Sequence, residues 1–185
     1  MKQQLLVAHG SEEEKIENLK RLFLRSLNDK SRYYHRLKDI VKIADWKDFY
    51  HGLLSEVKGY NSLDYIAPFL IEEGEYDWLF RLVEKAVKQD STDYRTPLRY
   101  AAALANTHEA KMKAILEQTF KAYASDCFRA GKKVKTSKYS YFREDLETLG
   151  TAGYTQTQKE LIEFLLTAYR SRPALVSQLR TLPSQ

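Results

Sequence analysis

The amino-acid sequence predicts an all-α protein, an array of about nine or ten stacked antiparallel helices that forms either an α-solenoid or an irregular helical bundle. Apolar side chains recur every three or four residues along most of the 185-residue chain, which is the spacing of one helix face. Seven Gly and four Pro make up about 6 % of the chain, roughly half the usual share, so few turns interrupt it. Short loops then make successive helices antiparallel.

The individual helices follow from this periodicity and from residues that favour helix ends. Ser11 and Glu14 have the spacing of a capping box. Gly74 is a stop signal, and Pro173 suits the first turn of the last helix. Pro68 lies inside a helical pattern, where its missing N–H predicts a kink or a later start. The expected helices span residues 11–27, 31–44, 45–57, 63–73, 76–89, 94–105, 108–130, 138–149, 155–169 or 157–169, and 173–182.

Four further residues are expected to mark helix boundaries. Asp45 has the chemistry of an N-cap for the third helix. Gly131 is expected to end the longest helix, and Gly150 with Gly153 to end the one that follows. The chain is expected to form one domain over residues 1–185, with residues 1–10 as a short N-terminal arm or first-helix start and residues 129–137 as a basic loop between helices.

Residues 63–90 resemble one tetratricopeptide-type helical hairpin. The resemblance is carried by Ala67 and Leu70 on the first helix, Gly74-Glu75-Tyr76 at the turn, and Leu79, Val83 and Ala86 on the second helix. The chain departs from the family because no small residue stands at Leu79, no aromatic residue at Val83 and no closing proline at Ser91. The resemblance implies a tetratricopeptide-like superhelix in the middle of the chain.

A second resemblance covers more of the chain in short pieces. These are Trp46 with Leu53-Leu54, the run from Ile66 to Asp77, Leu98-Arg99-Tyr100-Ala101, and Tyr169-Arg170-Ser171-Arg172-Pro173-Ala174-Leu175. In them the chain is similar to the helical C-terminal region of bacterial SWIM-type zinc-finger proteins. The resemblance implies a bacterial, repeat-like interaction scaffold. The zinc finger of those proteins needs three cysteines and a histidine and is absent from this sequence, which has a single cysteine, so its metal-dependent and nucleic-acid roles do not carry over.

The sequence contains none of the familiar catalytic or cofactor motifs. Its one cysteine, Cys127, excludes an intramolecular disulfide and a zinc site with two thiolates, and its place deep in a long helix predicts buried packing. The four histidines, which are His9, His35, His51 and His108, form no pair at helical zinc-site spacing. Clusters of carboxylates lie near expected helix ends, where solvated charges are common. We therefore expect no enzyme, no cofactor and no metal.

Residues 129–143 hold the most concentrated positive charge of the chain. Residues 129–185 carry ten Lys or Arg against five Asp or Glu, and no acid lies within 129–143. Cations interleaved with aromatic rings suit phosphates and unpaired bases, or an acidic protein, whereas a solvated loop needs no ligand at all. The candidate binding residues are Arg129, Lys132, Lys133, Lys135, Lys138, Tyr139, Tyr141 and Arg143.

The sequence thus favours a non-catalytic scaffold for protein–protein interaction with an unidentified protein partner. The alternative is a nucleic-acid-binding helical array that uses residues 129–143, and an enzyme with a carboxylate site between helices is the third class. Thirteen tyrosines either cover thin helical layers or line a partner groove. No apolar run has the length of a signal peptide or membrane span, and one cysteine suits a reducing compartment, so we expect a cytoplasmic protein without a membrane partner.

Overall fold

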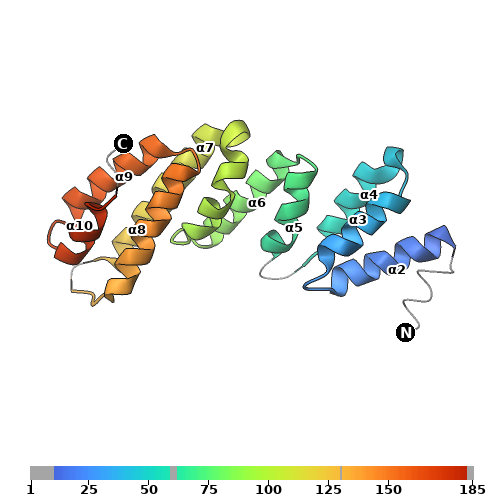
Figure 1. Ribbon diagram of the computed structural model, residues 1–185, viewed down its shortest axis with the longest axis horizontal. Helices are drawn as coiled ribbons and strands as arrows, with labels where there is room; N and C mark the ends of the chain where they lie inside the picture. The colour runs from blue at the N-terminus through green and yellow to red at the C-terminus, as the bar shows by residue number, and fades with distance from the viewer. Residues whose placement is uncertain (1–10, 59–61, 130, 183–185) are drawn as a thin grey trace. The chain divides into compact units, whose positions relative to one another are not determined.

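A computed structural model of the chain describes residues 11–58, 62–129 and 131–182 (Figure 1). These residues form nine α-helices and no strand, so the predicted all-α class is confirmed. The chain divides into two compact units, residues 1–69 and 70–185, where we expected one domain. Contacts in a stacked array are made mainly between neighbouring helices, which allows such an array to separate into units. The expected arm, residues 1–10, lies outside the described residues.

The N-terminal unit is built around a cluster of aromatic rings. Its helices are α2 (Glu12–Arg25), α3 (Lys30–Ile40), α4 (Ile43–Ser55) and the first part of α5 (Ser62–Glu72). The fully buried ring of Tyr34 lies at the centre of the cluster. Its centroid is 6.1 Å from that of Phe23, 5.2 Å from Trp46 and 4.3 Å from Phe69. One ring from each of four helices therefore forms this core.

Helix ends in the N-terminal unit follow the expectations in part. The capping box of α2 is confirmed, because Glu14 N donates to Ser11 Oγ at 3.2 Å and Ser11 N donates to Glu14 Oε2 at 2.9 Å. The prediction that Asp45 caps the next helix is wrong. The backbone is extended at Val41 and Lys42, so α4 begins earlier and Asp45 lies in its first turn. A carboxylate there is still favoured by the helix dipole.

A buried lysine closes the C-terminal end of α2. Lys30 Nζ donates to the carbonyl oxygens of Phe23 at 2.6 Å and of Leu24 at 3.5 Å, and it lies 4.7 Å from the centroid of the Phe23 ring. Burial lowers the pKa of the Lys30 ammonium. The last carbonyls of a helix have no partner within the helix, so this side chain satisfies a need that the sequence pattern does not display.

The C-terminal unit consists of helices that pack on one another in several pairs (Figure 1). After the end of α5 they are α6 (Tyr76–Gln89), α7 (Arg95–Cys127), α8 (Thr136–Thr151), α9 (Thr155–Ala168) and α10 (Pro173–Leu179). The long helix α7 packs against α6, α8 and α9, and α10 packs against α8 and α9. None of the described helices combines the length and the apolar character that crossing a membrane requires.

The local stop and start signals of this unit are largely confirmed. Gly74 has φ +73° after the end of α5, and Gly153 has φ +100° after the end of α8, a backbone region that favours glycine. Gly131 also has φ +81°, but the expectation that it ends the longest helix is wrong, because α7 already ends at Cys127. Pro173 is the first residue of α10, as expected. Pro68 lies inside α5, which starts at Ser62 and not after the proline.

The helix α7 contains the two segments that were expected as separate helices, and the break between them is confirmed. Among residues 95–127 the backbone leaves helical geometry at His108, where φ is −132° and ψ is 26°. The two parts fold back on each other there, because the ring centroid of Tyr94 lies 4.4 Å from that of Phe120. The imidazole of His108 stacks on the Phe80 ring at 4.4 Å between centroids, and its Nε2 lies 3.0 Å from the Asp77 carboxylate. Contacts with α6 thus hold the kink in place.

Gly150, expected to end α8 together with Gly153, lies in the last turn of that helix, one residue before its end at Thr151. A Cβ atom at this position would lie 2.5 Å from Gln158 Oε1. The Gln158 side chain is buried, and its Nε2 donates to the Leu146 carbonyl at 3.0 Å. The glycine therefore leaves room for the buried end of the Gln158 side chain, which no local pattern displays.

Replacing Gly150 by alanine will lower the free energy of unfolding by about 1–2 kcal/mol, because overpacking against Gln158 outweighs the better helix propensity of alanine. Gly52 in α4 has nothing within 4 Å of an added Cβ and is the matched control. Gly52→Ala will raise stability by about 0.5–1 kcal/mol. Urea unfolding followed by circular dichroism compares the two variants, and stabilisation by both would contradict the close approach at Gly150.

Candidate functional site

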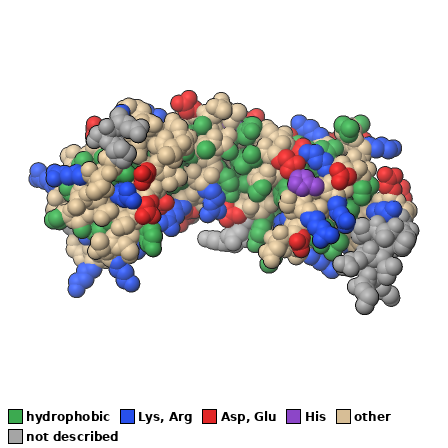
Figure 2. Space-filling model, viewed as in Figure 1, with side chains coloured by type: hydrophobic (Ala, Val, Ile, Leu, Met, Phe, Trp, Pro, Cys, Tyr) green, Lys and Arg blue, Asp and Glu red, His purple; other side chains and the backbone are tan. Residues whose placement is uncertain are grey.

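The basic segment 129–143 spans the connection between α7 and α8 and the first turns of α8. The connection consists of residues 128–135, because α7 ends at Cys127 and α8 begins at Thr136. Figure 2 shows Lys and Arg side chains projecting from the end of the C-terminal unit where α8 begins. Most of the cations of this segment are therefore at the surface, whereas Tyr139 and Phe142 are buried.

Two of its six cations are neutralised by acids that lie outside the segment in sequence. Lys132 Nζ is 3.2 Å from Asp126 Oδ2 and also donates to the Asp126 carbonyl at 3.0 Å. Arg143 Nη1 is 3.3 Å from Glu147 Oε2, one helical turn further on. The four exposed cations for which no ion pair is found among the described residues are Arg129, Lys133, Lys135 and Lys138. The positive surface is therefore smaller than the sequence indicates.

The two tyrosines of the segment have different environments. Tyr139 is only 4 % exposed, and its ring centroid lies 5.2 Å from that of Phe128. It belongs to the core, so the expectation that its ring could stack on a base or a partner is wrong. Tyr141 is 57 % exposed. Two residues apart on a helix they lie on different faces, and only Tyr141 presents its ring to solvent.

Arg172, to which the sequence analysis gave no role, connects three parts of the C-terminal unit. Its Nε donates to the Phe128 carbonyl at 3.1 Å, Nη1 donates to the Tyr139 hydroxyl at 3.2 Å, and Nη2 donates to the Arg129 carbonyl. The two carbonyls follow the end of α7, where the helix supplies no partner. The only signal for this role in the sequence is the pair Arg172-Pro173, which was quoted above for its resemblance to a known family.

A pocket of about 450 Å³ lies between the connection 128–135 and the turn from α9 to α10. We call it the basic pocket. Its lining residues are Gly131, Lys132, Lys133, Tyr139, Ser171, Arg172, Pro173 and Ala174. Every polar side chain among them can donate a hydrogen bond, and none of these described lining residues carries a carboxylate. The fold thus brings two residues of the α9–α10 turn, Ser171 and Arg172, to the basic segment.

A larger groove of about 600 Å³ lies between α7 and α8. We call it the α7–α8 groove. Its lining residues are Arg95, Leu98, Arg99 and Ala102 from α7, and Asp145, Thr148, Thr151 and Ala152 from α8. The α7 residues are spaced as one helix face, so the two exposed arginines lie one turn apart beside an apolar floor. No local pattern in the sequence indicates this groove, because its walls come from helices about 50 residues apart in the chain.

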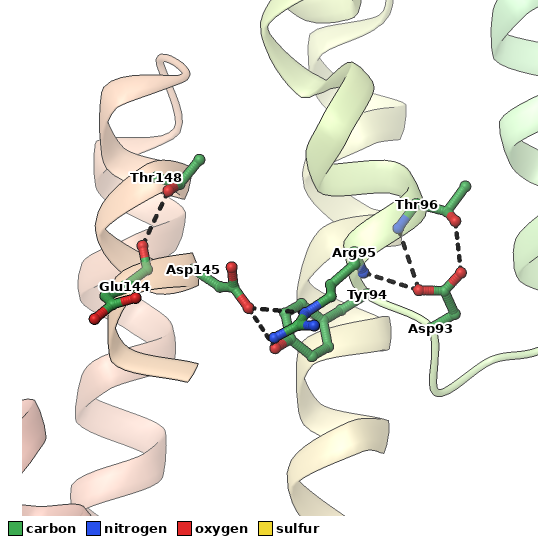
Figure 3. Close-up of polar contacts among 7 residues, drawn as sticks. All are labelled: Asp93, Tyr94, Arg95, Thr96, Glu144, Asp145 and Thr148. Carbon is green, nitrogen blue, oxygen red and sulfur yellow. Dashed lines mark hydrogen bonds and ion pairs between the residues drawn. The ribbon is translucent and has the colours of Figure 1, made fainter. Parts of the chain in front are cut away.

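Two aspartates fix the beginning of α7 beside this groove (Figure 3). Asp93 Oδ1 accepts from the amides of Arg95 at 3.1 Å and Thr96 at 3.2 Å, and the Thr96 hydroxyl donates to Asp93 Oδ2 at 2.5 Å. From α8, Asp145 Oδ2 accepts from the Tyr94 hydroxyl at 2.6 Å and from Arg95 Nε at 3.1 Å. These bonds give the arginine a defined position at the edge of the groove.

Electrostatics strengthen this arrangement. Burial, together with the hydrogen bond to Asp145, raises the pKa of the Tyr94 hydroxyl, which stays a protonated donor at neutral pH. The phenol and the guanidinium share one carboxylate oxygen of Asp145. Asp145 therefore orients Arg95 and offsets its charge, while Arg99 is the second cation that lines the groove.

The described residues contain no group of three or more His, Cys, Asp or Glu that could hold a metal ion. Cys127 is buried. Its neighbour Tyr123 has a pKa raised to about 12, chiefly by burial and then by a hydrogen bond with this thiol.

Comparison of the chain with protein-family models, curated proteins and solved structures found no match.

Proposed function

We propose that this chain is a non-catalytic helical scaffold of the cytoplasm that binds an acidic segment of a protein partner in the α7–α8 groove. The observation that carries the proposal is the pair Arg95 and Arg99, one helical turn apart over the apolar residues Leu98 and Ala102. The resemblance to the helical region of bacterial SWIM-type proteins, which implies an interaction scaffold, is consistent with this role.

The chemistry of the groove fits a peptide better than a small polar metabolite. An arginine fork binds carboxylates with two parallel hydrogen bonds, and Arg95 is already oriented by its contact with Asp145. Leu98, Ala102 and Ala152 offer an apolar surface to the side chains that flank an acid. A groove of about 600 Å³ accommodates a few residues of an extended segment.

Selection from a phage-displayed library of random short peptides tests this function without knowledge of the partner. We expect the selected peptides to be enriched in Asp or Glu beside apolar residues. Binding of those peptides will be lost in Arg99→Glu, which reverses a charge of the groove, and retained in Arg81→Glu. Arg81 is an exposed arginine on α6 that does not line the groove. Failure to select acidic peptides, or equal loss in both variants, would contradict the proposal.

Nucleic-acid binding remains a second candidate because of one observation. Arg129, Lys133, Lys135 and Lys138 are exposed without an ion pair to any described residue, and Tyr141 exposes its ring nearby in sequence. The ion pairs of Lys132 and Arg143 and the burial of Tyr139 reduce the surface that a nucleic acid could use.

Fluorescence anisotropy with a single-stranded oligonucleotide separates the two functions. For the scaffold we expect weak or no binding at about 150 mM salt. A nucleic-acid binder would instead show submicromolar binding that falls steeply with salt, and replacing Lys132, Lys133, Lys135 and Lys138 by serine would flatten the salt dependence by about one unit per lost contact. That second result would replace the scaffold by the nucleic-acid function.

A further inference from the structure

We propose that the basic pocket binds a dianionic phosphoryl group, either as inorganic phosphate or on a phosphate monoester. The pocket is separate in its lining residues from the α7–α8 groove, so the inference does not rest on the proposed function. The proposed site combines residues of the basic segment with Ser171 and Arg172 of the α9–α10 turn.

The pocket supplies hydrogen-bond donors that are not otherwise used. Lys133 and Ser171 have no hydrogen-bond partner among the described residues, so their ammonium and hydroxyl groups are available. Lys132 uses its ammonium on Asp126 through two contacts, and a third N–H remains. The Tyr139 hydroxyl accepts from Arg172 and so can donate its own proton. A phosphoryl group accepts several such bonds at once.

Arg172 is held in a fixed position before any ligand arrives. Three of its five N–H groups donate to Phe128, Arg129 and Tyr139, and the other two have no partner among the described residues. The Tyr139 ring that receives one of these bonds is itself buried. A guanidinium fork that is already ordered loses little conformational entropy when it binds an anion.

The charge of the pocket matches a dianion better than a phosphodiester. Lys132, Lys133 and Arg172 line it, and Asp126 offsets one of these three charges. A phosphate monoester carries about −1.5 to −2 charges at neutral pH, whereas each phosphodiester carries one and needs contacts along a strand. Lys135 and Lys138, which could follow such a strand, do not line the pocket.

Isothermal titration of the full chain with O-phosphoserine and with inorganic phosphate, at constant ionic strength, tests the proposal. We expect saturable binding, weakened about tenfold in Lys133→Ser and in Ser171→Ala through loss of one donor to a charged acceptor. Lys138→Ser removes an exposed cation of the same segment outside the pocket, and we expect it to leave the affinity within about twofold. Tighter binding of phosphoserine than of phosphate identifies a monoester, and the reverse identifies free phosphate.

A pH series shows whether the dianion is the bound form. The second proton of a monoester dissociates near pH 6, so phosphoserine will bind several-fold more weakly at about pH 5 than at about pH 7.5. Sulfate keeps both charges over this range and reports any change in the protein. Three results would overturn the proposal: no saturable binding, equal weakening by Lys133→Ser and Lys138→Ser, or tighter binding of a single-stranded oligonucleotide than of either phosphate probe.

Discussion

Replacing Phe142 by alanine will lower the free energy of unfolding by about 4 kcal/mol. Phe142 is fully buried, and its ring centroid lies 5.2 Å from that of Phe128, 5.5 Å from Tyr94, 5.5 Å from Tyr123 and 5.6 Å from Phe120. The truncation removes a ring from the centre of four others and leaves a cavity that rigid aromatic neighbours fill poorly. Urea unfolding followed by circular dichroism measures the loss.

The adjacent residue is the matched control for this change. Tyr141→Ala removes a ring of similar size that is 57 % exposed, so we expect a change of less than about 0.5 kcal/mol. Phe142→Leu keeps most of the apolar volume and will cost less than half as much as Phe142→Ala. Equal effects of Phe142→Ala and Tyr141→Ala would contradict the placement of Phe142 on the buried face of α8 and of Tyr141 on its exposed face.

The parts of the fold that could be predicted from sequence are those with local causes. The expected bounds of α6, residues 76–89, agree with the structure, because a strong apolar stripe lies between the stop at Gly74 and the loop that starts at Asp90. The start of α2 agrees as well, since Ser11 and Glu14 satisfy each other's amides within one turn. Such signals act over a few residues and need no knowledge of the partner helices.

The parts that were missed depend on distant residues. The pattern around Gly150 indicates a helix end, but it does not indicate that the glycine also leaves room for the Gln158 side chain from the next helix. Apolar periodicity continues across Val41 and Lys42, although the backbone there is extended and separates α3 from α4. A helix pattern records which face is apolar and does not record where tertiary packing interrupts it.

The candidate sites show the same limit. The distribution of charge along the sequence indicates the basic segment but does not show that Lys132 forms an ion pair with Asp126. The hydrogen bond between Tyr94 and Asp145 joins residues 51 positions apart, so no spacing rule reaches it. The sequence therefore indicated a charged surface, whereas the particular pockets follow from how α7, α8 and α10 meet.

Replacing Arg172 by alanine will lower the free energy of unfolding by about 3 kcal/mol, because three charge-assisted hydrogen bonds are lost and two carbonyls after α7 lose a partner. Arg172→Lys keeps the charge but not the planar fork, and we expect it to recover less than half of the loss. Arg170→Ala, two residues away, removes an exposed arginine that has no hydrogen bond or ion pair to the described residues, and it will be nearly neutral. Urea unfolding of the three variants distinguishes the contribution of the planar guanidinium from that of its charge. Full stability of Arg172→Lys would show that positive charge alone holds the α9–α10 turn against the end of α7.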